Sequence, residues 1–167
     1  MKAATQIALG FMVAFFVATG IVWLHHLVFP LPPEEASGGM AAFGDLVLFA
    51  GVFTLAAIIP TIGLLRLLNG VRAFWSVWTI VAVLLVLTGI VSGFMYVLPS
   101  LTGAHHFPVI YSLAPLRILS AAPLAIGFAL SGALAPPGTN RKVLLGCAGA
   151  EIIVFAAAAL KMVLSNA

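Results

Sequence analysis

Long stretches without a single charged side chain dominate the chain. Asp, Glu, Lys and Arg are absent from four runs, which cover residues 3–33, 46–65, 73–116 and 118–140. A helix needs about 20 apolar residues to cross the hydrocarbon core of a bilayer. Clusters of Pro, Gly and Asn divide the runs into five expected spans, at about residues 5–29, 45–67, 74–98, 112–134 and 143–164. The pattern predicts an all-α, polytopic integral membrane bundle of five transmembrane helices, with four as the alternative, in a single transmembrane domain over residues 1–167.

Composition supports the same class. Hydrophobic residues make up 63% of the chain and charged residues 7%, whereas about a quarter of the residues of a soluble domain are charged. A water-soluble fold is therefore excluded. The net charge of +3 comes from seven basic residues scattered among apolar segments, and these form no basic stripe for nucleic acid. The expected environment is the lipid bilayer, and no nucleic-acid partner is expected.

Basic residues predict the orientation of the bundle. They gather at the N-terminus and in two of the four loops, as Lys2, Arg66, Arg72, Arg141 and Lys142. Loops on the cytoplasmic side of a membrane carry an excess of Lys and Arg. We therefore expect a cytoplasmic N-terminus in a multi-pass protein of the cell membrane, of the bacterial inner-membrane type. The loops near residues 30–44 and 99–111 lack Lys and Arg and should lie on the outer side.

Small residues predict a packing face in the fourth span. Alanine recurs every four residues at Ala121, Ala125, Ala129 and Ala133, and such a face allows the backbone of another helix to approach closely. We expect this face to contact other membrane subunits or a second copy of the chain. Pro60 and Pro123 lie inside the second and fourth spans, and each is expected to kink its helix because proline has no N–H to donate.

All four histidines fall at the predicted outer face. His25 and His26 end the first span, and His105 and His106 lie in the third loop. Imidazoles and carboxylates together suit Zn, Cu, Fe or Mn, and a histidine at a helix end could also serve as an axial ligand of haem or a chlorophyll-type pigment. The candidate metal ligands are the four histidines with Glu34 and Glu35, and the candidate cofactor-binding residues are the four histidines with Tyr111 and Arg117. The alternative is that the histidines are ordinary interfacial polar residues.

Geometry limits such a metal site. Neighbouring residues on a helix point about 100° apart, which predicts that His25 and His26 do not both bind one ion and that the ion takes one histidine from each pair. The cofactor itself is not specified by these residues, and a transition metal or haem is the hypothesis they support.

Glu151 is the one carboxylate in the interior of a predicted span, since Asp45 lies at a span boundary. An acid within the membrane is costly and is a candidate functional residue. It could relay protons, bind an ion or pair with a base, and the structural alternative is a hydrogen-bonded acid buried between helices.

Three functions follow from these features. The first is a non-catalytic subunit or assembly component of a larger membrane complex. The second is a metal-, haem- or pigment-binding membrane protein that uses the outward-facing histidines. The third is a small ion- or proton-coupled carrier that uses Glu151. No nucleophile, base and orienting acid can be assembled from the chain, which favours a non-enzymatic role.

Overall fold

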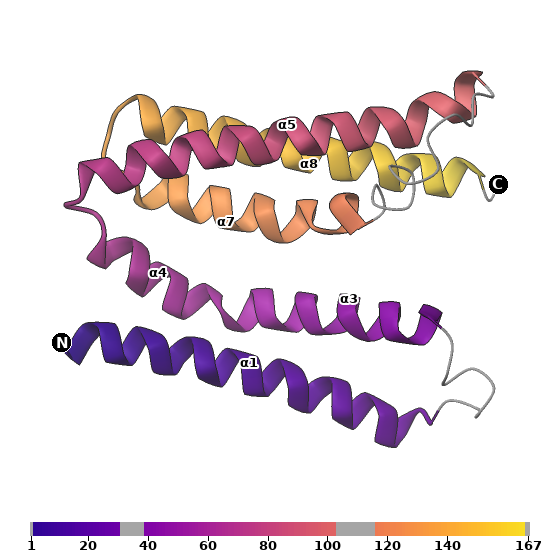
Figure 1. The fold of residues 1–167 in the computed structure, drawn as a ribbon, viewed down its shortest axis with the longest axis horizontal. Helices are drawn as coiled ribbons and strands as arrows, with labels where there is room; N and C mark the ends of the chain where they lie inside the picture. Colours follow the sequence, from indigo (N-terminus) through magenta and orange to yellow (C-terminus); the bar gives the residue numbers. More distant parts are fainter. Residues whose placement is uncertain (1, 31–38, 103–115, 166–167) are drawn as a thin grey trace. The chain divides into compact units, whose positions relative to one another are not determined.

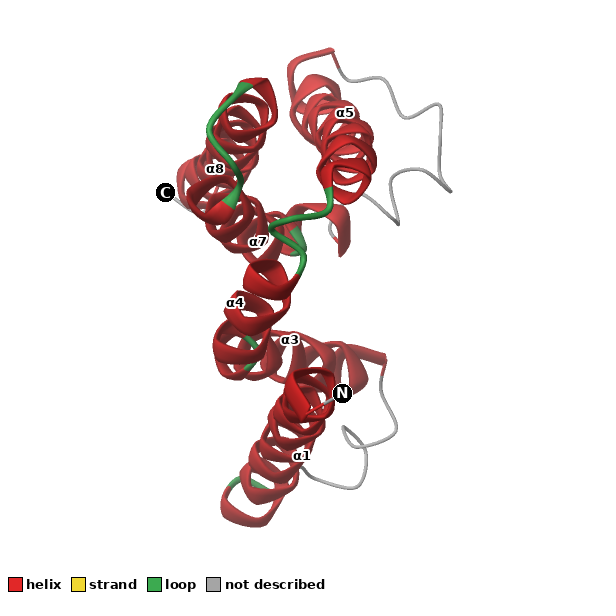
Figure 2. Cartoon of the chain, turned by 90° about the vertical axis from the view of Figure 1, so that its left-hand side faces the viewer, coloured by secondary structure: helices red, strands yellow, loops and turns green. Residues whose placement is uncertain are grey.

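The structure, a computed structural model, describes residues 2–30, 39–102 and 116–165. All regular secondary structure in this part of the chain is helical (Figure 2). Four of its helical segments are long and apolar enough to cross a membrane, and a bent pair of helices makes a fifth if it is one span. The predicted all-α, multi-pass architecture is confirmed. The described residues form two compact units, Met1–Leu67 and Leu68–Ala167, called here the N-terminal and C-terminal units, and the predicted single domain stays a prediction.

The N-terminal unit is a helical hairpin. Helix α1 covers Lys2–Val28, and the chain returns along it as α3 (Gly39–Ala56) and α4 (Ile58–Leu67), so that α1 contacts both (Figure 1). Ala14 and Ala18 are the buried residues of α1. Two helices alone bury little of their surface, and most apolar side chains of α1 remain exposed.

A bend of 50° separates the two halves of the returning span. The backbone hydrogen bonds from Ala57 to Phe53 and from Thr61 to Ala57 persist on either side of it. Pro60 lies three residues after the break and has no N–H to donate to the carbonyl one turn earlier, which explains the predicted kink. Helix α1 meets the kink at Gly10, where an added Cβ would lie 2.9 Å from the Cβ of Pro60.

The C-terminal unit contains three helices. Helix α5 covers Arg72–Thr102, α7 covers Ala121–Leu134 and α8 covers Thr139–Ser165. A helical turn from Leu116 extends the α7 span to 19 residues, and it is interrupted at Ser120, ahead of Pro123. Helix α8 packs against both α7 and α5, with α5 and α8 running in the same direction (Figure 1).

Glycine permits both of these close packings. An added Cβ at Gly132 of α7 would lie 2.7 Å from the Cγ of Leu145 on α8. On α5, Gly89 and Gly93 form a G-x-x-x-G pattern, a spacing that places both glycines on one helix face. A Cβ at Gly93 would contact Val154 of α8 at 3.4 Å. This motif is not among the packing faces expected from the sequence.

The predicted alanine face lies partly inside the C-terminal unit. Ala121 and Ala125 are buried, Ala129 is half-buried and Ala133 is exposed. The outer surfaces of both units carry exposed large apolar side chains, among them Phe16 at 64% and Ile153 at 70%. Such surfaces suit lipid, in which apolar side chains need no cover from water.

Candidate functional site

Within the described part of the chain, a cluster of side chains suited to metal binding lies in the N-terminal unit. His25 and His26 occupy the last turn of α1, where the amide of Phe29 closes the final backbone bond to the carbonyl of His25 at 2.8 Å. Pro30 follows directly and cannot extend the helix. Asp45 lies in the second turn of α3, and because α3 runs back along α1, these segments lie side by side (Figure 1).

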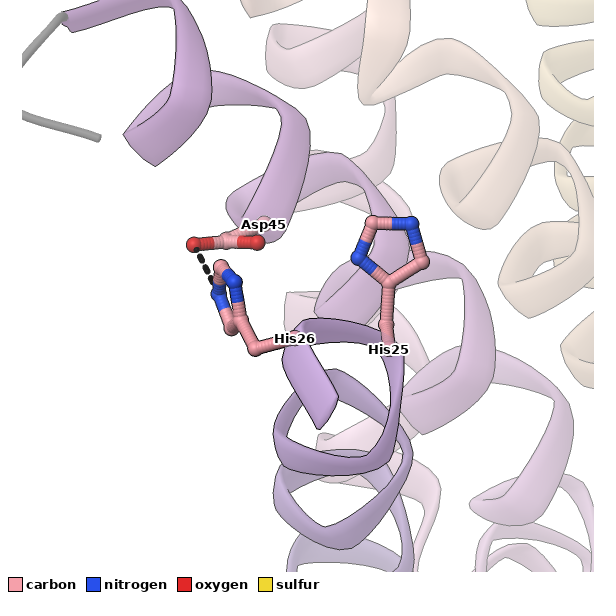
Figure 3. Close-up of side chains that lie close together, drawn as sticks. All are labelled: His25, His26 and Asp45. Atoms are coloured by element: carbon pink, nitrogen blue, oxygen red, sulfur yellow. Dashed lines mark hydrogen bonds and ion pairs between the residues drawn. The ribbon is translucent and has the colours of Figure 1, made fainter. Parts of the chain in front are cut away.

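Asp45 bonds directly to one of the two histidines. Its Oδ2 lies 2.9 Å from Nε2 of His26, with 31% and 40% of the two side chains exposed. The rings of His25 and His26 are 5.9 Å apart between centroids. Figure 3 shows the carboxylate of Asp45 directed toward His26, with His25 on the same helix as His26. One ligand atom from each residue lies within 4.8 Å of the other two.

These separations are close to those of a metal site. Metal–nitrogen and metal–oxygen bonds to zinc are about 2.0–2.2 Å long, so two ligands in tetrahedral coordination lie about 3.4 Å apart. Side-chain torsions that move the ligand atoms by about 1 Å would bring His25, His26 and Asp45 to such separations. The three residues thus offer a partly exposed set of two imidazoles and one carboxylate.

The prediction that His25 and His26 do not both bind one ion stays a prediction, although the geometry of the two rings favours a shared site. Their Cα–Cβ bonds diverge, but each imidazole extends well beyond Cβ, and the two rings turn so that their nitrogens and Asp45 gather within 4.8 Å. Asp45 is the member that the predicted metal set omitted. The available signal was its position at the start of the second span, which an antiparallel hairpin places opposite the end of the first.

Five of the other predicted site residues lie outside the described residues, namely Glu34, Glu35, His105, His106 and Tyr111. Arg117 belongs to the C-terminal unit, where it contacts a different set of partners.

Arg117 forms an ion pair with Glu151 in the interior of that unit. Its Nη2 lies 2.5 Å from Oε1 and its Nη1 lies 3.2 Å from Oε2. The Glu151 side chain is fully buried and 14% of the Arg117 side chain is exposed. The sequence does not predict this pair. Arg117 lies near the outer end of its predicted span, whereas Glu151 lies in the interior of another span.

The remaining donors of Arg117 are also occupied. Nε donates to the hydroxyl of Thr88 at 3.0 Å, Nη2 donates to the carbonyl of Leu85 at 2.6 Å, and Nη1 donates to the hydroxyl of Ser120 at 3.3 Å. A guanidinium has five N–H groups, and these contacts together with the two to Glu151 account for all five. The pair is therefore a closed, fully hydrogen-bonded connection among α5, the start of the α7 span and α8.

A basic residue of α8, Lys161, is also anchored within the unit. The ammonium group of Lys161 donates to the carbonyl of Tyr96 and lies 4.0 Å from the centroid of the Tyr96 ring. This contact satisfies part of the hydrogen-bonding capacity of a cation whose neighbours in the second half of α8 are mostly apolar.

Comparison with known proteins gives no functional assignment: no protein-family model, curated protein or solved structure matches the chain.

Proposed function

We propose that this multi-pass membrane protein binds one divalent transition-metal ion through His25, His26 and Asp45. The observation that supports the proposal is the convergence of three ligand atoms within 4.8 Å, from two helices of one hairpin. Imidazole and carboxylate are ligands that Zn, Cu, Ni and ferrous Fe accept. The carboxylate also balances part of the charge of the ion.

The number of ligands indicates the type of site. A closed structural zinc site holds four protein ligands, whereas sites with three keep a position for water or another molecule. His25, His26 and Asp45 supply three, and 40% of the His26 side chain is exposed. The proposed role is therefore capture or exchange of an ion at the membrane surface. By the distribution of Lys and Arg along the chain, we assign this surface to the outer side.

The two other functions inferred from the sequence have less support. A role as a subunit of a larger complex stays a prediction, because exposed apolar side chains suit lipid as well as a partner helix. The carrier role of Glu151 also stays a prediction. Its carboxylate makes two hydrogen bonds to Arg117, an arrangement that favours a structural role.

Metal titration of the purified full-length protein tests the proposal. Isothermal titration with Zn²⁺, Co²⁺ and Ni²⁺ in detergent, with elemental analysis of the dialysed complex, should give one bound ion per chain. His25→Ala, His26→Ala and Asp45→Asn should each weaken binding by about tenfold or more, since second-shell losses alone cost 10–100-fold. Wild type that binds no ion at stoichiometric level would refute the proposal.

His105→Ala and His106→Ala are the matched controls. Each removes one imidazole from the third loop, outside the described residues, and the proposed three-ligand site requires neither of them. We expect both variants to bind metal as wild type does. If they lose binding while His25→Ala and Asp45→Asn keep it, the ion binds elsewhere and the proposed site is wrong.

A further inference from the structure

A polar cavity lies in the C-terminal unit, separate from the histidine cluster. It has a volume of about 330 Å³ and forms where the start of α5 meets the turn between α7 and α8. Its walls include the side chains of Arg72, Trp75 and Ser76, the Pro136–Gly138 turn, and Thr139 with Asn140 at the start of α8. Ligand pockets in proteins have volumes from about 300 Å³ upward, so the cavity is large enough for a small group.

The charge around the cavity is positive. Arg72 lies in its wall, and Arg141 and Lys142 follow Asn140 in the first turn of α8. Glu151 is the only acidic side chain among residues 68–167, and it already forms an ion pair with Arg117. The three cations near the cavity therefore have no carboxylate side chain of their own unit left to pair with.

Two helix N-termini lie at the cavity. Arg72 is the first residue of α5 and Thr139 is the first residue of α8. The first backbone N–H groups of a helix lack intrahelical acceptors, and the helix dipole places partial positive charge there. Gly138 leads into α8 with φ of +153°, a conformation that favours glycine.

A buried donor of a residue that lines the cavity has no partner. Trp75 is 1% exposed, and its Nε1 has no hydrogen-bond partner within the described part of the chain. By contrast, Trp78, one turn later on α5, donates from Nε1 to the hydroxyl of Ser131 at 3.0 Å. A buried donor without a partner costs about 1–3 kcal/mol. An acceptor that reaches Nε1 from the cavity would remove this cost.

From these observations we propose that the cavity binds a phosphate group. A phosphate oxyanion supplies acceptors for the guanidinium of Arg72, the hydroxyl of Thr139, the N–H groups at the start of α8 and the indole of Trp75. It also supplies the negative charge that this end of the unit lacks. The phosphate comes either from an anionic phospholipid headgroup or from a soluble phosphate compound. This site is independent of the proposed metal site, since the two share no residue.

Two arms of one experiment separate these sources. In the first arm, inorganic phosphate is titrated into the delipidated, detergent-solubilised protein at constant ionic strength, and binding is measured by calorimetry. In the second arm, the protein is reconstituted in nanodiscs of phosphatidylcholine with or without phosphatidylglycerol, and retained lipid is identified by native mass spectrometry. Saturable binding in the first arm indicates a soluble phosphate, and selective retention of phosphatidylglycerol indicates a lipid headgroup. The absence of both would overturn the proposal.

Matched variants link the binding to the cavity. Arg72→Gln should weaken binding by about tenfold or more, because hydrogen bonds between charged groups are the strongest. Arg66→Gln is the control: it removes one exposed positive charge from α4, in the other unit. We expect its affinity to remain within about twofold of wild type. Equal losses in the two variants would show non-specific attraction and overturn the proposal.

The indole provides a direct readout. The side-chain ¹⁵N–¹H resonance of Trp75, identified by its absence in Trp75→Phe, should shift on addition of phosphate with the midpoint measured by calorimetry. The resonance of Trp78 should stay in place because its N–H already donates to Ser131. A Trp75 resonance that does not move at saturating phosphate would also overturn the proposal.

Discussion

Arg117 and Glu151 are 34 residues apart in sequence and form a two-pronged ion pair, with Nη2–Oε1 and Nη1–Oε2 distances of 2.5 and 3.2 Å. The carboxylate is fully buried. A charge in that position is tolerated only when its partner and its hydrogen bonds are all present. The pair therefore makes the packing of three helices dependent on two side chains.

Removing one member should destabilise the C-terminal unit strongly. Glu151→Leu leaves the guanidinium of Arg117 without its counter-ion in an apolar interior, which typically costs about 3–5 kcal/mol of unfolding free energy. Unfolding in detergent, followed by circular dichroism, measures the effect. The double variant Arg117→Met with Glu151→Leu should recover most of the loss, because it removes both charges. If Glu151→Leu is as stable as wild type, the pair does not hold the unit together.

Gly89 should be as sensitive as the pair that it contacts. A Cβ added at Gly89 would lie 2.6 Å from Nη2 of Arg117 and 3.2 Å from Oε1 of Glu151, so Gly89→Ala forces the pair apart. We expect a loss of about 1–3 kcal/mol in unfolding free energy. Gly127→Ala in α7 is the control, since a Cβ there meets nothing within 4 Å. A Gly89→Ala variant as stable as the control would contradict this prediction.

The sequence predicts the class of fold well because charge-free runs of 20 residues have few alternatives to membrane helices. The sequence also predicts the kink near Pro60. Proline removes one backbone hydrogen bond from the helix that contains it, so the effect is local and can be read from the sequence. The pairing of Arg117 with Glu151 depends on how α5, the α7 span and α8 pack together. No local pattern encodes that packing, although a lone intramembrane acid indicates that some base lies near it.

The candidate metal site was partly predictable for the same reason. His25 and His26 are conspicuous as a pair at the end of the first span. Asp45 becomes their partner only because α3 packs along α1 in the opposite direction. This packing places Asp45 beside the last turn of α1. Imidazole side chains rotate about two bonds, so the directions of their Cβ atoms do not decide whether their nitrogens can meet.

Gly10 should control the packing of the N-terminal hairpin at the Pro60 bend. Gly10→Ala introduces a Cβ 2.9 Å from the Cβ of Pro60, and neither the proline ring nor the helix backbone moves easily. We expect a loss of about 1–3 kcal/mol. Gly20→Ala, on the same helix with open space around it, should be neutral or stabilising by up to about 1 kcal/mol, because alanine favours helix. Equal effects of the two substitutions on thermal unfolding would argue against a close α1–α4 contact.

Metal binding should stabilise the N-terminal hairpin selectively. The proposed ligands come from α1 and α3, so an ion held by all three connects the end of one helix to the start of the next. At a free metal concentration 100 times the dissociation constant, a ligand that binds only the folded state contributes about 2.7 kcal/mol. Hydrogen exchange measured by mass spectrometry should therefore slow near residues 20–28 and 41–50 when Zn²⁺ is added.

The same measurement contains its own controls. A chelator should reverse the protection, and Asp45→Asn should abolish it, because a neutral amide is a poorer ligand than a carboxylate. Exchange in α8 should not change, since none of the proposed ligands belongs to the C-terminal unit. Protection that spreads evenly over both units, or that persists in Asp45→Asn, would mean that the ion acts at another place in the protein. Protection confined to the ends of α1 and α3 that meet at Asp45 would instead locate the ion between His25, His26 and Asp45.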